Sequence, residues 1–519
     1  MALSINIAGP YIPGKHYMLP PERRLGRVLQ LIEERKYFTL HAGRQTGKTT
    51  SLMWLEDHLD AAGGCRALWV DLETAREQPD VARAMAAVLD AIDRALAQRH
   101  HAWSRPGRAE VDAMLARPQS ALLAYLQHLV GLESQPLVLL CDEADGLVGE
   151  AMVSCLTQLR HGYIERSRVP FPASVVLVGQ RQVRDYSLRQ EERRTLTWLG
   201  TTSPFNITAE ATTLGPFTEA EVGELLGQHT AATGQRFAPE ATARIYELGQ
   251  GHPWLTNALA DQIVRRDVKD RGTEVTAAHV DAAKETIILE RRSHIDSLVA
   301  RLREPRVRRI LAPMLTGGTT EGDVLDDDFA YVVGLGLVGM ARGQWAIANP
   351  IYQEVIPRAL TYVQQGQIAV EPAVFVQPDG SLDMGKLMAE WQVFWRKDGH
   401  LAAEGFAYRE AGPHLMLMAF LQRIVNGGGR VEREYGLGRG ALDLMIFWRG
   451  ARHAIEVKLR RDTETEAEAL EQVGRYLNHA EIGDGWLVMF DLRKEVSWAD
   501  KLFLREVQHE GKTIRIVGC

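Results

Sequence analysis

Cysteine is scarce in this sequence, and its few copies are scattered. The 519 residues include four cysteines, Cys65, Cys141, Cys155 and Cys519, and none forms a C-x-x-C pair. This spacing predicts neither a zinc site nor a disulfide framework. We therefore expect a protein of a reducing compartment, the cytoplasm.

Long apolar runs and an excess of basic charge are also missing. No stretch approaches 18 uninterrupted apolar residues, and the N-terminal segment lacks an apolar signal region, so we expect no membrane segment. The formal net charge is -7, so any nucleic-acid surface must be a local patch. The length exceeds what one hydrophobic core usually organises and predicts roughly three or four domains.

A glycine-containing loop near the N-terminus is the strongest motif that is present. A short apolar strand at 37–40 runs into AGRQTGKT, and a helix with leucines at helical spacing follows. Main-chain N–H groups of such a loop wrap phosphates. Lys48 is expected to reach the β- and γ-phosphates, and Thr49 to bind Mg²⁺. The predicted nucleotide-binding residues are Ala42, Gly43, Arg44, Gln45, Thr46, Gly47, Lys48, Thr49 and Thr50.

One position departs from the phosphate-loop pattern. Ala42 stands where the motif has its first glycine. Because alanine tolerates a positive φ less well than glycine, we expect Gly43 to take the bend. The alternative for the whole stretch is a glycine-rich turn without a ligand, but strand, loop and helix together favour phosphate binding.

Two acids follow a second apolar strand, at 136–141. We expect Asp142 to hold Mg²⁺ through water and Glu143 to polarise the attacking water. Acids also follow strands as helix caps, but the phosphate loop upstream favours the catalytic interpretation. A third apolar strand ends in Gln180 and Arg181, for which a γ-phosphate sensor and a solvated strand end are equally compatible.

Alternating strands and helices imply a parallel sheet flanked by helices. With its phosphate loop, LLCDEAD, VVLVGQRQVRD and LGQGHPWLTNALADQIV, the chain up to about 365 resembles AAA-like P-loop ATPases of the STAND and archaeal-ATPase type. The resemblance implies ATP as ligand and a homo-oligomer on ATP binding. It implies an ATPase core at 1–215, a helical lid at 216–285 and Pro253 near the nucleotide, although a plain helix end is the alternative for Pro253. The pattern at 286–365 predicts a winged-helix module.

A second core is predicted at 406–519, joined by a connector at 366–405. The expected order is a helix, three short strands in a meander, a helix and two more strands. Asp443 lies mid-strand between apolar neighbours, where a lone charge is expensive to bury. Twelve residues separate it from Glu456, which shares a strand face with Lys458.

Two carboxylates that meet in space form a hard-oxygen site for Mg²⁺ or Mn²⁺. We expect Asp443 and Glu456 to be its ligands, with the Val457 carbonyl as a further one. Lys458 would orient or help to deprotonate the attacking water and stabilise charge on the phosphate. An alternating edge strand with one wet face is the alternative.

These residues resemble the motif of the PD-(D/E)XK nuclease superfamily, although Leu442 replaces the motif proline. Gln472 and Tyr476, four positions apart on one helix face, resemble the Gln-x-x-x-Tyr motif of RecB-like members, which lies near the DNA. An upstream acid often assists the metal in this superfamily. The acids that compete for this role are Glu434, Glu432 and, third, Glu410.

The predicted fold class is α/β: a P-loop NTPase sheet with helical lid, a winged-helix module and a C-terminal restriction-endonuclease-like domain. The predicted function is an ATPase coupled to a Mg²⁺-dependent DNA endonuclease. The architecture resembles ATPase–nuclease fusions, and a role in defence against foreign DNA is the expectation that goes with this resemblance. The alternative is a nucleotide-switched factor that binds DNA or protein and does not cut. The fold cannot decide between DNA and RNA, and DNA is the favoured partner.

Overall fold

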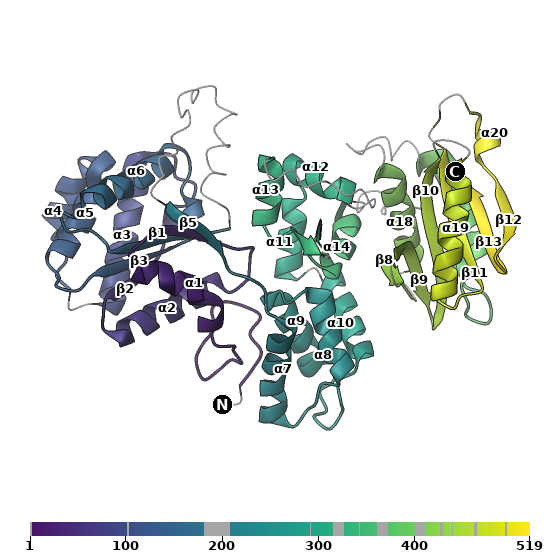
Figure 1. The fold of residues 1–519 in the computed structure, drawn as a ribbon, viewed down its shortest axis with the longest axis horizontal. Coiled ribbons are helices and arrows are strands. Elements are labelled where there is room, and N and C mark those ends of the chain that lie inside the picture. The colour runs from purple at the N-terminus through teal and green to yellow at the C-terminus, as the bar shows by residue number, and fades with distance from the viewer. Residues whose placement is uncertain are drawn as a thin grey trace. The chain divides into compact units, whose positions relative to one another are not determined.

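The computed structural model describes residues 3–100, 103–180, 208–290, 292–314, 326–341, 343–360, 372–399, 411–425, 429–437, 440–460, 464–491, 493 and 496–519. The chain forms two compact units (Figure 1). Unit 1 comprises Met1–His294 and Val324–Gly339, and unit 2 comprises Ile295–Asp323 and Met340–Cys519.

Unit 1 contains a five-stranded sheet in which all neighbouring strands are parallel. In order across the sheet, the strands are β2 (Arg66–Asp71), β3 (Leu137–Asp142), β4 (Ser174–Gly179), β1 (Tyr37–His41) and β5 (Thr208–Thr213). This confirms the predicted parallel sheet. Because the strands are parallel, the loop after β1 and the acids after β3 lie at the same edge of the sheet, with β4 between their strands.

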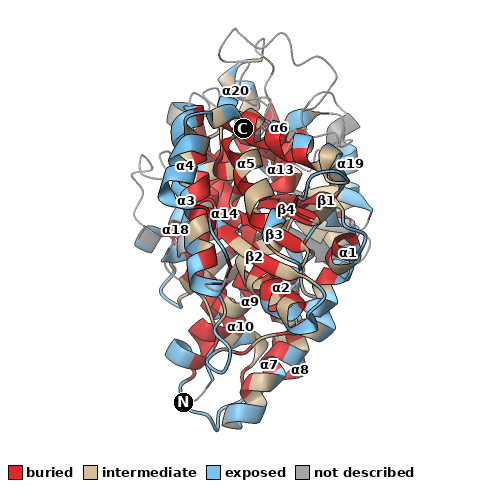
Figure 2. Cartoon of the chain, turned by 90° about the vertical axis from the view of Figure 1, so that its left-hand side faces the viewer, coloured by how far each residue is buried: buried red, intermediate tan, exposed pale blue. Residues whose placement is uncertain are grey.

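Helices cover both faces of this sheet, and alternate strand residues enter opposite cores. Phe38 and Leu40 pack with helices α1 and α2, whereas Tyr37 packs with α3, α5 and α6. Figure 2 shows β1 to β4 buried between the helices of unit 1. The helices are α1 (Glu22–Glu33), α2 (Lys48–Ala62), α3 (Val81–Arg99), α4 (Arg108–Leu115), α5 (Pro118–Gly131) and α6 (Gly149–Glu165).

Four helices follow β5 and make up the segment that the sequence predicts to be a lid. They are α7 (Glu219–Thr233), α8 (Pro239–Gly249), α9 (Pro253–Gln262) and α10 (Ala277–Leu289). The threonine and glutamate three positions apart, Thr218 and Glu221, predict a capping box at the start of α7. The structure has it: the Thr218 hydroxyl accepts the Glu221 N–H at 3.2 Å and the Glu221 carboxylate accepts the Thr218 N–H at 2.8 Å. Proline occupies the first position of α8 and α9, where its missing N–H leaves no helix bond unmade.

Three helices, a hairpin and a fourth helix follow the lid in the order that the sequence predicts. They are α11 (Ser293–Arg301), α12 (Pro305–Met314), α13 (Asp327–Gly334), β6 (Val338–Ala341), β7 (Gln344–Ile347) and α14 (Pro350–Leu360). Across the described part of the chain, no helix is both long enough and apolar enough to cross a bilayer.

Unit 2 contains a six-stranded mixed sheet. In order across it, the strands are β12 (Leu504–His509), β13 (Lys512–Gly518), β11 (Asp484–Asp491), β10 (Ala451–Arg460), β9 (Gly440–Trp448) and β8 (Gly429–Leu437). β10 pairs antiparallel with β9 and parallel with β11. The predicted meander of β8, β9 and β10 is confirmed, whereas the edge strand β12 was not predicted.

The helices of unit 2 pack on opposite faces of this sheet. Ile455 and Val457 of β10 enter the core that contains α16 and α18, and Ala454 enters the core that contains α19. Glu456 and Lys458 therefore share the face of α19, because strand side chains alternate. Among the described residues after α14, the helices are α16 (Met384–Phe394), α18 (Ala411–Val425), α19 (Glu464–His479) and α20 (Trp498–Lys501).

One part of the predicted connector belongs to this core. Trp391 of α16 is fully buried, and its ring lies 5.3 Å from that of Phe420 and 6.1 Å from that of Phe490. The amphipathic spacing of the sequence around Trp391 predicts a helix in this connector, but it does not reveal the helix's packing partners, because they lie in later elements. The expectation of a simple connector across 366–405 is therefore wrong for α16.

Candidate functional site

The phosphate-type loop spans residues 42–47, between β1 and α2. The left-handed residues in it are Gln45, with φ 58°, and Gly47, with φ 92°. Ala42 and Gly43 have no positive φ, so the expected bend at Gly43 is wrong and alanine is unstrained at position 42. Gly43 is needed for space instead, because a Cβ there would lie 2.9 Å from the Leu335 carbonyl oxygen.

Lys48 points back into the loop and is only 8% exposed. Its Nζ donates to the carbonyls of Ala42 and Gly43, each at 3.0 Å. Burial lowers the pKa of Lys48, while the acids Glu143 and Asp142 oppose that shift. The ammonium is thus largely dehydrated inside the loop, which favours binding of an anion.

The other predicted loop residues surround this lysine. The Thr46 hydroxyl donates to the Gly43 carbonyl at 2.9 Å and closes the loop. The Thr50 hydroxyl accepts the Tyr11 N–H at 3.2 Å, which ties the N-terminal segment to α2. Arg44 is exposed.

Thr49 and Asp142 meet across the sheet edge. The Thr49 hydroxyl donates to Asp142 Oδ2 at 2.7 Å, although the two residues are 93 positions apart in the chain. Asp142 is 2% exposed, and burial raises its pKa while the Thr49 bond lowers it. A hydroxyl and a carboxylate are the oxygen ligands that Mg²⁺ prefers, so this pair fits the predicted metal role.

Glu143 lies beside Asp142 and has an arginine partner that the sequence did not reveal. Glu143 has a left-handed backbone, with φ 51°. Its Oε2 accepts from Arg76 Nη2 at 2.7 Å. Burial and the charges of Asp145 and Asp142 raise the pKa of Glu143, while Lys48 and Arg76 oppose this. Arg76 follows β2, 67 positions away, and no local pattern marks it.

Of the two residues predicted as γ-phosphate sensors, the structure describes one. The Gln180 N–H donates to Asp145 Oδ2 at 3.1 Å, which holds the end of β4 next to the acidic turn. Arg181 lies outside the described residues. Pro253 begins α9, and the preceding His252 is hydrogen-bonded to the main chain of Arg44 in the loop. The Gly-x-Pro turn therefore lies against the phosphate loop. That Pro253 lies near a bound nucleotide stays a prediction.

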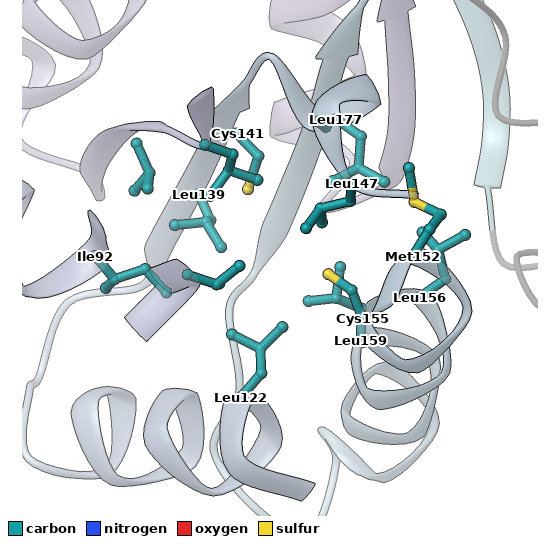
Figure 3. Close-up of a pocket in the computed structure, with 14 residues that line it drawn as sticks. Ile92, Leu122, Leu139, Cys141, Leu147, Met152, Cys155, Leu156, Leu159 and Leu177 are labelled. Carbon is teal, nitrogen blue, oxygen red and sulfur yellow. The ribbon is translucent and has the colours of Figure 1, made fainter. Parts of the chain in front are cut away.

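A small cavity in unit 1 is not part of this site. It lies between β3, α5 and α6, and Figure 3 shows apolar side chains pointing into it, among them Leu122, Leu139 and Leu156. Two thiols, of Cys141 and Cys155, also line it, and burial raises the pKa of both. The lining has no groups to hold phosphate, so the cavity is a packing gap in the core.

The carboxylates of unit 2 meet where β9 and β10 stop pairing through their main chains. The ladder ends at Ile455 opposite Leu444. Beyond it, Asp443 Oδ2 accepts the Val457 N–H at 2.8 Å, and Glu456 Oε2 accepts the Asp443 N–H at 3.4 Å. The two side chains thus replace main-chain acceptors, and the structure brings together the two acids that the sequence selected.

Lys458 completes this group. Its Nζ lies 2.8 Å from Glu456 Oε1, and Glu456 is fully buried. Burial, followed by the charge of Asp443, raises the pKa of Glu456 to about 7, while Lys458 opposes the shift. Burial lowers the pKa of Lys458, but the charges of Glu456 and Asp443 outweigh it and leave that pKa raised. Excess negative charge in a buried place favours a bound cation.

The helix above this group carries the predicted polar pair. Gln472 Nε2 donates to Tyr476 Oη at 3.0 Å, which confirms that they share one face of α19. Tyr476 lies close enough to Lys458 to affect its pKa. Glu434 and Glu432 lie on β8, but their side chains fall outside the described part, as does Glu410 entirely. Within the described residues, no group of three or more His, Cys, Asp or Glu side chains gathers around one point.

A parallel α/β sheet with a strand–loop–helix phosphate site and a Thr49–Asp142 pair defines a P-loop NTPase domain. Residues 32–186 match the family model described as AAA domain. This part of the chain is therefore an AAA-type P-loop ATPase domain. Comparison with curated protein sequences finds no match.

Solved structures are similar to this chain at low sequence identity. A Walker-type ATPase of Pyrococcus abyssi is 14% identical, with a TM-score of 0.46, over 68% of this chain and 99% of that chain. Cdc6p from Pyrobaculum aerophilum is 13% identical, with a TM-score of 0.38, over 69% of this chain and 97% of that chain. RuvB of Thermotoga maritima, a Holliday junction branch migration motor, is 13% identical, with a TM-score of 0.33, over 64% of this chain and 93% of that chain.

Proposed function

We propose that this protein hydrolyses ATP in unit 1 and cuts DNA at the carboxylate site of unit 2, with the nucleotide state controlling the cut. The observation that carries the nuclease half is the meeting of Asp443 and Glu456 beside Lys458. The AAA domain supports the ATPase half. ATP-dependent assembly into a homo-oligomer, and a role in defence against foreign DNA, belong to the same proposal.

In unit 1, Lys48 would neutralise the β- and γ-phosphates from inside the loop. Thr49 and Asp142 would hold Mg²⁺, which supplies charge neutralisation on those phosphates. Glu143 would orient the attacking water, and for that it has to share or leave its bond with Arg76. While Glu143 Oε2 is bonded to Arg76 Nη2 at 2.7 Å, this carboxylate oxygen is not free to activate water. Arg76 would therefore hold back hydrolysis until that bond is released or shared.

In unit 2, Asp443 and Glu456 would hold a divalent cation, with the Val457 carbonyl as a third oxygen. The cation would supply Lewis acidity at the scissile phosphate. Lys458 would orient the nucleophilic water and stabilise negative charge on the phosphate. Its ion pair with Glu456 at 2.8 Å supports this position.

DNA is the proposed substrate because Gln472 and Tyr476 fit the motif that resembles RecB-like nucleases. Their mutual bond at 3.0 Å orients the phenol on the face of the sheet that carries Lys458. Residues 286–365 remain proposed as a winged-helix module, with three helices, a hairpin and a fourth helix in the required order. Residues 1–215, 216–285 and 406–519 remain the proposed core, lid and nuclease-like domain.

A plasmid cleavage assay tests the proposal, with ATP and either Mg²⁺ or Mn²⁺ varied independently. The wild type should cut, and Asp443→Ala and Glu456→Ala should each abolish cutting while ATP hydrolysis continues. Asp484→Ala is the matched control, because this acid also lies on the sheet but pairs with Arg515 at 2.7 Å and is half exposed. It should cut like the wild type.

The outcomes separate the candidate functions. A wild type that cuts neither DNA nor RNA under any nucleotide condition would remove the nuclease half. If its particle size then changes with a slowly hydrolysed ATP analogue, the protein is a nucleotide-switched binding factor. Cleavage of RNA alone would change the substrate, and cleavage that persists in Asp443→Ala would place the active site elsewhere.

A further inference from the structure

Helix α1 carries three arginines that bind to the segment 214–218, which joins β5 to the lid, and to the residues on both sides of it. Arg27 pairs with Glu210 of β5, and Arg23 pairs with Glu224 of α7 at 2.6 Å. Arg24 contacts the segment itself, because its Nε donates to the Gly215 carbonyl at 2.9 Å. The helix therefore spans the hinge between the sheet and the lid.

Arg24 also contacts the phosphate loop. Its Nη2 donates to the Thr46 carbonyl at 3.2 Å, and a Cβ on Gly47 would lie 3.7 Å from its Nη1. The guanidinium stacks on Phe217, 5.0 Å from the ring centre. Within the described part of the chain, no carboxylate forms an ion pair with it. Burial lowers the pKa of Arg24 to about 10, so it stays charged at neutral pH.

A single peptide unit joins this contact to the nucleotide site. The peptide between Thr46 and Gly47 is planar, so its carbonyl and its N–H point in opposite directions and move together. Arg24 holds the carbonyl. The main-chain N–H groups of a phosphate loop wrap the phosphates, and Gly47 is among the residues predicted to bind the nucleotide. A tilt of this peptide on phosphate binding would therefore change the hydrogen bond between Arg24 and the Thr46 carbonyl.

The hinge that Arg24 holds is in turn bonded to a second lid segment. The Phe217 N–H donates to the Gly251 carbonyl at 2.8 Å, and a Cβ on Gly251 would lie 1.8 Å from the Phe217 oxygen. The next residue, His252, is bonded to the main chain of Arg44. The hinge, the Gly-x-Pro turn and the phosphate loop are therefore each in contact with the other two: Arg24 joins the loop to the hinge, the hinge is bonded to Gly251, and His252 is bonded to the loop.

We propose that Arg24 is a positioning residue that couples the nucleotide state of the phosphate loop to the position of the lid, by holding the Thr46 and Gly215 carbonyls on one guanidinium. This inference rests on the proposed binding of ATP. A guanidinium suits the task because its donors lie in a rigid plane and can serve two acceptors at once. A lysine has one ammonium and cannot reproduce that geometry.

The test compares the full-length wild type with Arg24→Ala, Arg24→Lys and the matched control Arg23→Ala. Two quantities are measured: the Kd for ATP, and hydrogen exchange at residues 215–217 and 249–253 with and without ATP. In the wild type and in Arg23→Ala, ATP should slow exchange at both segments. The Kd of Arg24→Ala for ATP should stay within about 10-fold of the wild-type value, because one hydrogen bond contributes about that much to an equilibrium constant. The variant should nevertheless lose the ATP-dependent slowing of exchange at both segments.

Arg24→Lys guards against a folding defect, because it keeps the charge and most of the stem. It should lose at least half of the ATP-dependent protection. Unchanged protection in either Arg24 variant, or an equal loss in Arg23→Ala, would overturn the coupling role. A wild type that does not bind ATP is a different failure, since it removes the proposed function itself.

Discussion

The phosphate loop of unit 1 takes most of its chemistry from one short stretch of chain, whereas the carboxylate site of unit 2 is assembled from two strands and a helix. The two sites also differ in charge. Lys48 is a buried cation that donates to carbonyls, whereas the half-buried Asp443 and the fully buried Glu456 are two carboxylates balanced by one lysine. The charge of Lys48 favours an anionic ligand, and the charges of the two carboxylates favour a cationic one. In both sites burial strengthens these electrostatic interactions.

This difference explains why the phosphate loop is easier to recognise in the sequence than the carboxylate site. A loop that wraps phosphate needs glycine and lysine at fixed spacing, so its motif is local. A two-carboxylate site needs two strands that pair in the right register, so each of its acids is marked only by its apolar strand neighbours, which is a weaker local signal. The following changes test whether each site and each unit behaves as this comparison indicates.

The largest effect should follow Lys48→Ala, which removes the buried cation of the loop. We expect ATP turnover to fall about 100-fold or more, because a preorganised charge at the phosphates is lost. Phosphate release measures this, and Lys15→Ala, an exposed lysine, is the control. If cleavage of DNA in the variant keeps its full ATP dependence, the two sites are not linked as proposed.

Next in size is Trp391→Ala, which should destabilise unit 2 by about 3–5 kcal/mol, since it empties a fully buried site. Denaturant unfolding followed by hydrogen exchange of peptides from each unit gives the measurement. Val393→Ala on the same helix is the control, because Val393 is 58% exposed. Equal loss of stability in unit 1 would contradict the separation of the units.

A smaller effect is expected from Gly251→Ala in the lid, compared with Gly234→Ala. Both glycines have positive φ, 70° and 80°, so each alanine should cost about 1 kcal/mol in backbone strain. A Cβ at Gly251 also overlaps the Phe217 oxygen at 1.8 Å, whereas Gly234 faces open space. Gly251→Ala should therefore lose about 1–3 kcal/mol more in thermal or urea unfolding of unit 1. Equal losses would refute the close contact.

The smallest effects concern pH, and the contributions of His252 in unit 1 and of Glu456 in unit 2 should have opposite signs. Burial lowers the pKa of His252 to about 4, so its contribution is present above the unfolded value of 6.5 and is lost as pH falls towards 4. The pKa of Glu456 is raised to about 7, so its contribution is present below 4.5 and is lost as pH rises through 7.

Unit-resolved unfolding between pH 5 and pH 8 measures these slopes, each on the order of 1 kcal/mol per pH unit. The neutral variant Glu456→Gln should flatten the slope of unit 2 and leave that of unit 1 unchanged. A slope of unit 2 that survives this substitution would assign the pH dependence to another group.

The sequence by itself determined the elements whose cause is local. Hydrophobic alternation marked the strand at 37–40 and the meander in unit 2, and the Thr218 capping box marked the start of a lid helix. It also selected Asp443 and Glu456, because a charge between apolar strand neighbours needs a reason. These signals depend on residues a few positions apart, so no knowledge of the fold was required.

The tertiary structure alone decided the partners. Arg76 reaches Glu143 across 67 positions, Arg24 reaches Gly215 across 191, and α16 joins the core of unit 2 through Trp391 and Phe490. It also moved the bend of the loop from Gly43 to Gln45 and Gly47. Such contacts are set by how helices pack on a sheet, and a linear pattern carries no record of which distant side chain will meet a buried charge.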